Sequence, residues 1–145
     1  MDPLNFPAYT FQLSRSEEKE FIYDPIRKKK VVLTPEEWVR QHVLAFLVQT
    51  QNYPMSLIAV ERMIQFNNLK KRFDVMLYNK QGHPQMLIEC KAPEVNLSSE
   101  TLFQISTYNM VFKVPHLFVS NGLKHLLFQL NEAGNYESVS EFPVL

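Results

Sequence analysis

Two apolar segments on either side of a short turn constrain the fold of this chain most strongly. They are RFDVMLYN at residues 72–79 and PQMLIECKA at residues 84–92, and the four residues KQGH join them. Two apolar runs around a short connection that contains glycine predict a β-hairpin. Because both runs are apolar on both faces, we expect these strands in the middle of a sheet that is covered on each side.

A helix is predicted on each side of this hairpin along the chain. Thr34 can cap a helix that begins at Pro35, and Glu37 completes a capping box. The segment SSETLFQISTYNMVFK, residues 98–113, predicts a second helix with one of its first two serines as the cap.

The remaining apolar runs predict strands, and the order of elements predicts the fold class. The runs are SLIAVERMIQF, HLFVSN and HLLFQL, and the tail YESVSEFPVL can add an edge strand. The order helix, three strands, helix, two strands predicts an α/β protein with a mixed sheet and helices on both faces. We expect a single domain over residues 1–145, in which residues 1–30 form an irregular N-terminal arm with short extended pieces.

Composition excludes several classes of protein. The chain has 145 residues, 46% of them hydrophobic, which suits one domain with a sizeable core. Its three glycines leave no glycine-rich phosphate loop, and its one cysteine, Cys90, excludes an intramolecular disulfide. We see neither a signal peptide nor an apolar run of about 20 residues, and we therefore expect a cytoplasmic protein without a membrane partner.

Three charged residues fall where the two hairpin strands meet. Glu89 and Lys91 are two positions apart and share one face of their strand, whereas Cys90 points to the other face. In an antiparallel hairpin the beginning of one strand lies beside the end of the other, so Asp74 can approach both charges. Such a cluster at the edge of a buried sheet costs free energy unless its members pair or bind something.

The residues alone leave two interpretations of this cluster open. Two carboxylates and a backbone carbonyl are hard oxygen ligands of the kind that Mg²⁺ prefers. A bound ion can polarise a phosphate, and the lysine can stabilise developing charge, which together would hydrolyse a phosphodiester. Alternatively, Lys91 forms only a strand-end salt bridge with one of the two acids.

At these residues the chain resembles the core of the PD-(D/E)XK nuclease superfamily. The segment RFDVMLYNKQGHPQMLIECKAP carries the resemblance, with Asp74 on the first acid of the motif, Glu89 on the second and Lys91 on its lysine. More narrowly, the chain resembles the N-terminal nuclease region of the R subunit of type I restriction enzymes.

Further elements extend the resemblance from about Asp24 to Leu130. QISTY is similar to the Q-x-x-x-Y element of that branch, and VSNG is similar to its next strand and turn, usually written T-N-G. DPIRKKKVVLTPEEWVRQ resembles the opening of small stand-alone members of the group.

The resemblance implies a restriction-endonuclease-like core and a Mg²⁺-dependent endonuclease site, in which Mn²⁺ is a possible substitute. Asp74, Glu89 and the carbonyl of Cys90 would hold the metal, with Lys91 near the attacking water. The catalytic residues that it implies are Asp74, Glu89, Lys91, Gln104 and Tyr108. Gln104 and Tyr108 lie one helical turn apart and can face the site or DNA, or can serve only to pack the helix on the sheet.

Other charged residues carry weaker expectations. Glu37 and Glu61 are possible extra acids at the metal, although Glu37 already has a capping role and Glu61 can pair with a nearby arginine. Two basic clusters can contact DNA phosphates or can lie in solvated loops. They are Lys70, Lys71 and Arg72, and residues 27–30.

The resemblance departs from the full type I enzyme in one respect. R subunits couple the nuclease to an ATP-driven motor, but this chain has no G-x-x-x-x-G-K-[ST] motif and no room for a motor domain. We therefore keep two hypotheses: a Mg²⁺-dependent deoxyribonuclease, which can borrow a separate motor or specificity subunit, or a non-catalytic DNA- or protein-binding module that retains the nuclease fold.

Overall fold

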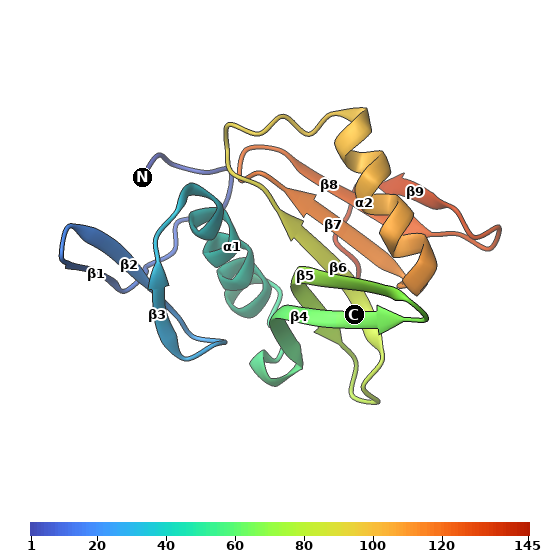
Figure 1. Ribbon diagram of the computed structural model, residues 1–145, viewed down its shortest axis with the longest axis horizontal. Coiled ribbons are helices and arrows are strands. Elements are labelled where there is room, and N and C mark those ends of the chain that lie inside the picture. The colour runs from blue at the N-terminus through green and yellow to red at the C-terminus, as the bar shows by residue number, and fades with distance from the viewer.

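The protein is a mixed α+β structure built around a six-stranded sheet (Figure 1). The computed structural model describes the backbone of residues 1–145 and the side chains of all of them except residues 66 and 108–111. The strand order is β4-β5-β6-β7-β8-β9. The strands are β4 (Ile58–Phe66), β5 (Leu69–Tyr78), β6 (Pro84–Cys90), β7 (His116–Ser120), β8 (His125–Leu130) and β9 (Tyr136–Val139).

The expected hairpin is confirmed as β5 and β6, which are antiparallel and lie inside the sheet. Val75 pairs with Ile88, and the pairing shifts at Leu77 and Tyr78, next to the turn. β6 then pairs with β7 in parallel. A parallel pair needs a long crossover, and the second helix supplies it, so the sheet is mixed as predicted.

Both expected helices are present. In α1 (Pro35–Ala45) the Thr34 hydroxyl accepts a hydrogen bond from the backbone N–H of Glu37 at 3.0 Å. α1 continues as a π-helical segment, η1 (Phe46–Thr50), and a 3₁₀ turn, η2 (Met55–Leu57), leads into β4. In α2 (Ser99–Phe112) the Ser98 hydroxyl accepts from the N–H of Thr101, which makes Ser98 the cap.

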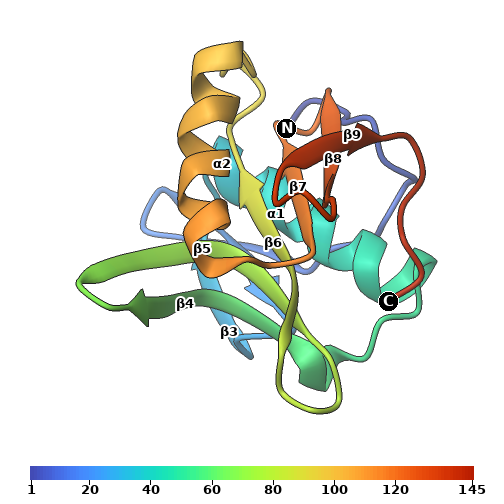
Figure 2. The ribbon, with the colours of Figure 1, turned by 90° about the vertical axis from the view of Figure 1, so that its right-hand side faces the viewer.

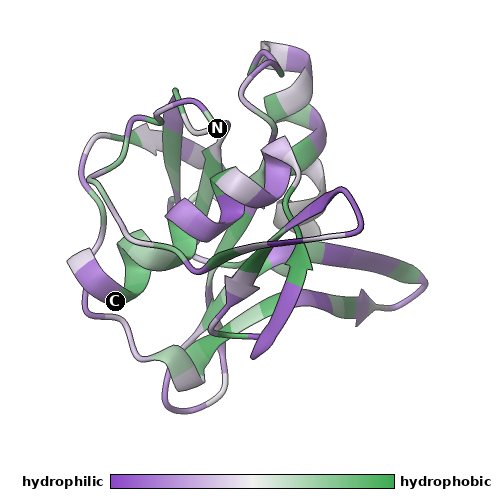
Figure 3. Ribbon diagram, turned by 90° about the vertical axis from the view of Figure 1, so that its left-hand side faces the viewer, coloured by the Kyte–Doolittle hydropathy of each residue, from purple (hydrophilic) through white to green (hydrophobic). Residues whose placement is uncertain are grey.

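The two helices cover opposite faces of the sheet. One buried cluster joins α1 to alternate residues of β6, namely Met86, Ile88 and Cys90. The other joins α2 to the residue between them, Leu87, and to Leu117 of β7. Figure 2 shows the six-stranded sheet between the two helices, and in Figure 3 the hydrophobic colour is concentrated on its central strands. Cys90 is fully buried, as expected for a residue that points away from Glu89 and Lys91.

The N-terminal segment, expected as an arm with short extended pieces, is more regular than predicted. Residues 13–32 form an antiparallel sheet of β1 (Leu13–Ser16), β2 (Lys19–Asp24) and β3 (Lys29–Val32) beside α1 (Figure 1). The Asp24 carboxylate accepts hydrogen bonds from the N–H groups of Ile26 and Arg27, and this closes the turn between β2 and β3. β3 was missed because its sequence, KKVV, has no alternation of apolar and polar residues.

Within the described part of the chain, no helix has the length and apolar character that a bilayer crossing requires.

Candidate functional site

Asp74 and Glu89 lie opposite each other on neighbouring strands. Val75 pairs with Ile88 in the antiparallel register. Asp74, which precedes Val75, therefore lies opposite Glu89, which follows Ile88. The Oδ2 atom of Asp74 accepts a hydrogen bond of 2.7 Å from the backbone N–H of Cys90, which fixes this carboxylate against the end of β6. The structure therefore brings the two predicted acids together at the point where the strands meet.

Glu89 is a buried carboxyl group whose pKa is strongly raised. The residue is 4% exposed, and among the described side chains its Oε1 atom is a buried oxygen without a hydrogen-bond partner. Burial and the negative charge of Asp74 raise the pKa of Glu89 to about 8, although Lys71 and Lys91 act in the opposite direction. Two acids that cannot both ionise at low cost are typical of a site that accepts a cation.

Lys91 lies within electrostatic range of Glu89. Its positive charge lowers the pKa of Glu89 and also that of Glu36 in the first turn of α1. The Lys91 N–H donates a hydrogen bond of 2.8 Å to the carbonyl of Ser120, the last residue of β7. Lys91 directly follows β6, so Asp74 of β5, Glu89 of β6 and Lys91 occupy neighbouring positions of the hairpin.

Glu36 is the acid of α1 that the sequence interpretation missed. Burial and the charge of Asp74 raise its pKa, whereas the charge of Lys91 lowers it, so Glu36 lies within electrostatic range of both. Thr34 caps the helix through the N–H of Glu37, and this capping signal singled out Glu37 rather than its neighbour Glu36.

Glu37 and Glu61 belong to an ion-pair network that Arg40 connects to Asp74. Arg40 donates hydrogen bonds to Glu37 at 2.7 and 3.0 Å and to Glu61 at 3.2 Å, and its Nη1 lies 3.8 Å from Oδ1 of Asp74. Although burial alone would raise it, hydrogen bonds from Arg40 and Arg27 lower the pKa of Glu37 to about 2. Arg40 therefore holds Asp74 from the side of α1.

The network continues into the N-terminal sheet. Arg27, from the turn between β2 and β3, donates to Asp24 at 2.6 Å and to Glu37 at 2.8 Å. The side chain of Gln41 donates to the same two carboxylates. Arg27, which the sequence placed in a basic cluster, is thus an internal residue of the network.

Glu61 occupies a strained position in β4. It lies between Val60 and Arg62, whose partners on β5 are Val75 and Phe73, and the register skips Glu61 itself. Its φ is 55°, in the left-handed region that costs a side chain about 1–3 kcal/mol. In this conformation Glu61 pairs with both Arg40 and Arg27, at 3.2 and 3.6 Å.

The other predicted site residues lie on α2 and β5. Gln104 is exposed on α2, and the side chain of Tyr108 lies outside the described residues. Lys70 and Arg72 are exposed on β5, whereas Lys71 lies 3.8 Å from Oε1 of Glu89.

The oxygen atoms of Asp74, Glu89 and the Cys90 carbonyl suit a small hard cation. Two carboxylates face each other, the backbone carbonyl of Cys90 follows Glu89 directly, and Oε1 of Glu89 is a buried acceptor with no donor among the described side chains. Oxygen ligands of this kind, completed by water, are those of Mg²⁺. No set of three or more His, Cys, Asp or Glu side chains in the described part of the chain is arranged to hold an ion, so water and backbone would complete the shell.

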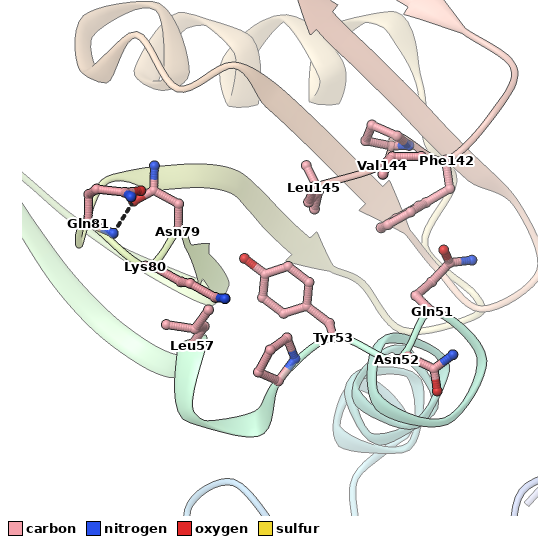
Figure 4. Close-up of a pocket in the computed structure, with 12 residues that line it drawn as sticks. Gln51, Asn52, Tyr53, Leu57, Asn79, Lys80, Gln81, Phe142, Val144 and Leu145 are labelled. Carbon is pink, nitrogen blue, oxygen red and sulfur yellow. Dashed lines mark hydrogen bonds between the residues drawn. The ribbon is translucent and has the colours of Figure 1, made fainter.

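A cavity of about 460 Å³ lies away from these acids (Figure 4). It opens between the end of η1, the β5–β6 turn and the C-terminal residues, and the ring of Tyr53 points into it (Figure 4). The Tyr53 hydroxyl donates a hydrogen bond to the carbonyl of Tyr78. Asp74, Glu89 and Lys91 are not among the residues that line it, so the cavity is separate from the charged site.

Comparison with known proteins identifies the family. Residues 35–143 match the sequence model of the family described as type I restriction enzyme R protein N terminus. The chain belongs to this family. No curated protein and no solved structure gives a significant match. The region of the family match contains α1 and the whole six-stranded sheet, and it leaves β1, β2 and β3 outside.

The raised pKa of Glu89 predicts how the stability of the ion-free protein depends on pH. The folded protein holds this proton more tightly than the unfolded chain, so its contribution to stability is complete below about pH 4.5 and is lost as pH rises through about 8. We expect the free energy of unfolding in urea with EDTA to fall by on the order of 3 kcal/mol more in the wild type than in Glu89→Gln between pH 5 and 9.

The matched control is Glu137→Gln, an exposed glutamate of β9. It should follow the wild-type pH profile. If the free energy of unfolding of Glu89→Gln showed the same pH dependence as that of the wild type, burial of the Glu89 charge would carry no cost.

Proposed function

We propose that this protein is a Mg²⁺-dependent endodeoxyribonuclease with a restriction-endonuclease-like core. The observation that carries the proposal is the pair of facing carboxylates, Asp74 and Glu89, in which a buried oxygen of Glu89 has no hydrogen-bond donor among the described side chains. Membership of the R protein N-terminal family supports it, because those proteins belong to restriction enzymes. The mixed sheet between two helices fits such a core.

In this proposal each residue has a defined task. Asp74 is held by the N–H of Cys90 and by Arg40, and with Glu89 it binds the ion. Once bound, the ion supplies a Lewis acid for the phosphate and lowers the pKa of a water molecule. Lys91 orients that water and stabilises the negative charge that develops on the phosphoryl oxygens. Glu36 can add a carboxylate from α1.

DNA contacts would come from the basic residues that face solvent. Lys70 and Arg72 are exposed on β5, in the β4–β5 hairpin that extends beyond α2 (Figure 2). The chain carries 15 basic and 15 acidic residues, so attraction to phosphate would be local rather than global. Binding through phosphates should weaken steeply as salt is added. Gln104 and Tyr108 remain proposed residues of the DNA-facing helix, and a separate motor or specificity subunit remains a proposed partner.

The direct test is cleavage of supercoiled plasmid. We expect nicking with Mg²⁺ or Mn²⁺ and none with EDTA, and we expect Lys91→Ala to reduce the rate at least about 100-fold because charge stabilisation is lost. Lys80→Ala, an exposed lysine in the β5–β6 turn, is the matched control. Circular dichroism should show both variants folded.

A folded wild type that cuts neither single- nor double-stranded DNA with either metal would contradict the proposal. A non-catalytic DNA- or protein-binding module would then be the better description.

A further inference from the structure

Lys71 differs from the basic residues on either side of it. Its side chain is 30% exposed, whereas Lys70 and Arg72 face solvent. Its Nζ lies 3.8 Å from Oε1 of Glu89 and 5.8 Å from the centre of the Phe73 ring. The ammonium group therefore turns inward, toward the acid pair, and does not extend outward with its neighbours.

The contact with Glu89 is electrostatic rather than a hydrogen bond. At 3.8 Å the two atoms are close enough for an ion pair, yet Oε1 has no hydrogen-bond partner among the described side chains. The lysine partly offsets the charge of a 4% exposed carboxylate without occupying its lone pairs. Glu89 thus remains available to a ligand that can bond to the oxygen directly.

A divalent cation bound to this oxygen would lie within a few ångströms of the ammonium group. Two positive groups a few ångströms apart in a partly buried site repel each other strongly. The ammonium repels a doubly charged ion about twice as strongly as it repels a proton on the same carboxyl group. Removal of Lys71 should therefore favour the metal even though a proton would also bind more tightly.

We propose that Lys71 is the internal counter-ion of Glu89 and that it limits how tightly the Asp74–Glu89 pair binds a divalent cation. The inference rests on the proposed metal site. It assigns Lys71 a role at that site through its charge on Glu89, without direct contact with the metal. In the ion-free protein, the charge of Lys71 reduces the repulsion between the two carboxylates. When a metal ion is bound, the same charge repels it and weakens its binding. Lys91 and Arg40, whose charges also act on these acids, remain in place in every variant below.

The first experiment measures Mn²⁺ binding by isothermal titration calorimetry, without DNA, at fixed pH and salt. Lys71→Gln is expected to bind Mn²⁺ about 10-fold more tightly than the wild type, because one nearby positive charge is gone. Lys71→Arg keeps the charge and should stay within about twofold of the wild type. Lys80→Gln, an exposed lysine in the β5–β6 turn and outside the proposed site, should also stay within about twofold.

The second experiment tests the ion pair in the absence of metal. Urea midpoints are compared for the wild type, Lys71→Gln, Glu89→Gln and the double variant in EDTA at pH 8.5. Lys71→Gln should lower the midpoint when Glu89 is present and should leave it nearly unchanged when position 89 is glutamine.

The results distinguish a failure of this inference from a failure of the proposed metal site. Equal or weaker Mn²⁺ binding by Lys71→Gln, or equal midpoint changes in both backgrounds, would overturn the inference while the proposed nuclease stands. If the wild type binds no Mn²⁺ at millimolar concentration, the proposed metal site fails, and the repulsion inferred for Lys71 fails with it.

Discussion

Replacement of Glu89 by glutamine is expected to reduce metal-dependent DNA cleavage by about 10³-fold, or roughly 4 kcal/mol in the activation barrier. Glutamine has nearly the same shape, but it lacks the negative charge that the ion requires at this position. The effect should appear in single-turnover rates at saturating DNA, and an increase in Mg²⁺ concentration should recover only part of it.

The same substitution separates a loss of chemistry from a loss of fold. Because burial makes ionisation of Glu89 costly, the ion-free glutamine variant should be at least as stable as the wild type at pH 8. Glu94→Gln, in the exposed loop after β6, is the matched control and should retain wild-type cleavage. A Glu89→Gln protein that cuts within tenfold of the wild type would show that Glu89 is no metal ligand.

The largest expected effect on stability comes from Arg40. Replacement by methionine should lower the free energy of unfolding by about 3–5 kcal/mol, because it leaves a buried acid without its main partner. Glu37 is 5% exposed and receives two hydrogen bonds from Arg40. Urea unfolding followed by tryptophan fluorescence measures the change, since Trp38 lies on the same helix.

Arg15→Met is the matched control for this measurement. Arg15 pairs with Glu20 at 3.6 Å, but both side chains are more than half exposed, so its loss should cost less than about 1 kcal/mol. Similar losses for the two variants would mean that the Arg40 network adds nothing beyond a surface ion pair.

The local pattern of the chain was sufficient to predict the central elements. The apolar runs around Gly82 predicted the β5–β6 hairpin, and the Thr34 cap predicted the start of α1. The hairpin register then implied that Asp74 would face Glu89, because pairing in an antiparallel ladder is fixed by the turn. These predictions depend only on residues close together in sequence.

The parts that failed depend on contacts between distant segments. In the N-terminal sheet, β1 and β3 are mostly exposed, and their sequences LSRS and KKVV lack the apolar alternation that identifies a strand. Which glutamate of the first turn of α1 comes within electrostatic range of Asp74 depends on how the helix packs on the sheet, where Arg27 and Arg40 bind Glu37. The inward turn of Lys71 likewise depends on the buried charge of Glu89 on the next strand.

The network from Asp24 to Asp74 also crosses the boundary of the homologous region. The family match begins at residue 35, yet Arg27 and Asp24, which lie upstream, complete the partners of Glu37 and Gln41. The stretch matched by the family model and the stretch joined by this ion-pair network thus begin at different residues. A relative that had only the matched region, residues 35–143, would lack Arg27. It would need another positive group to pair with the glutamate at the position of Glu37.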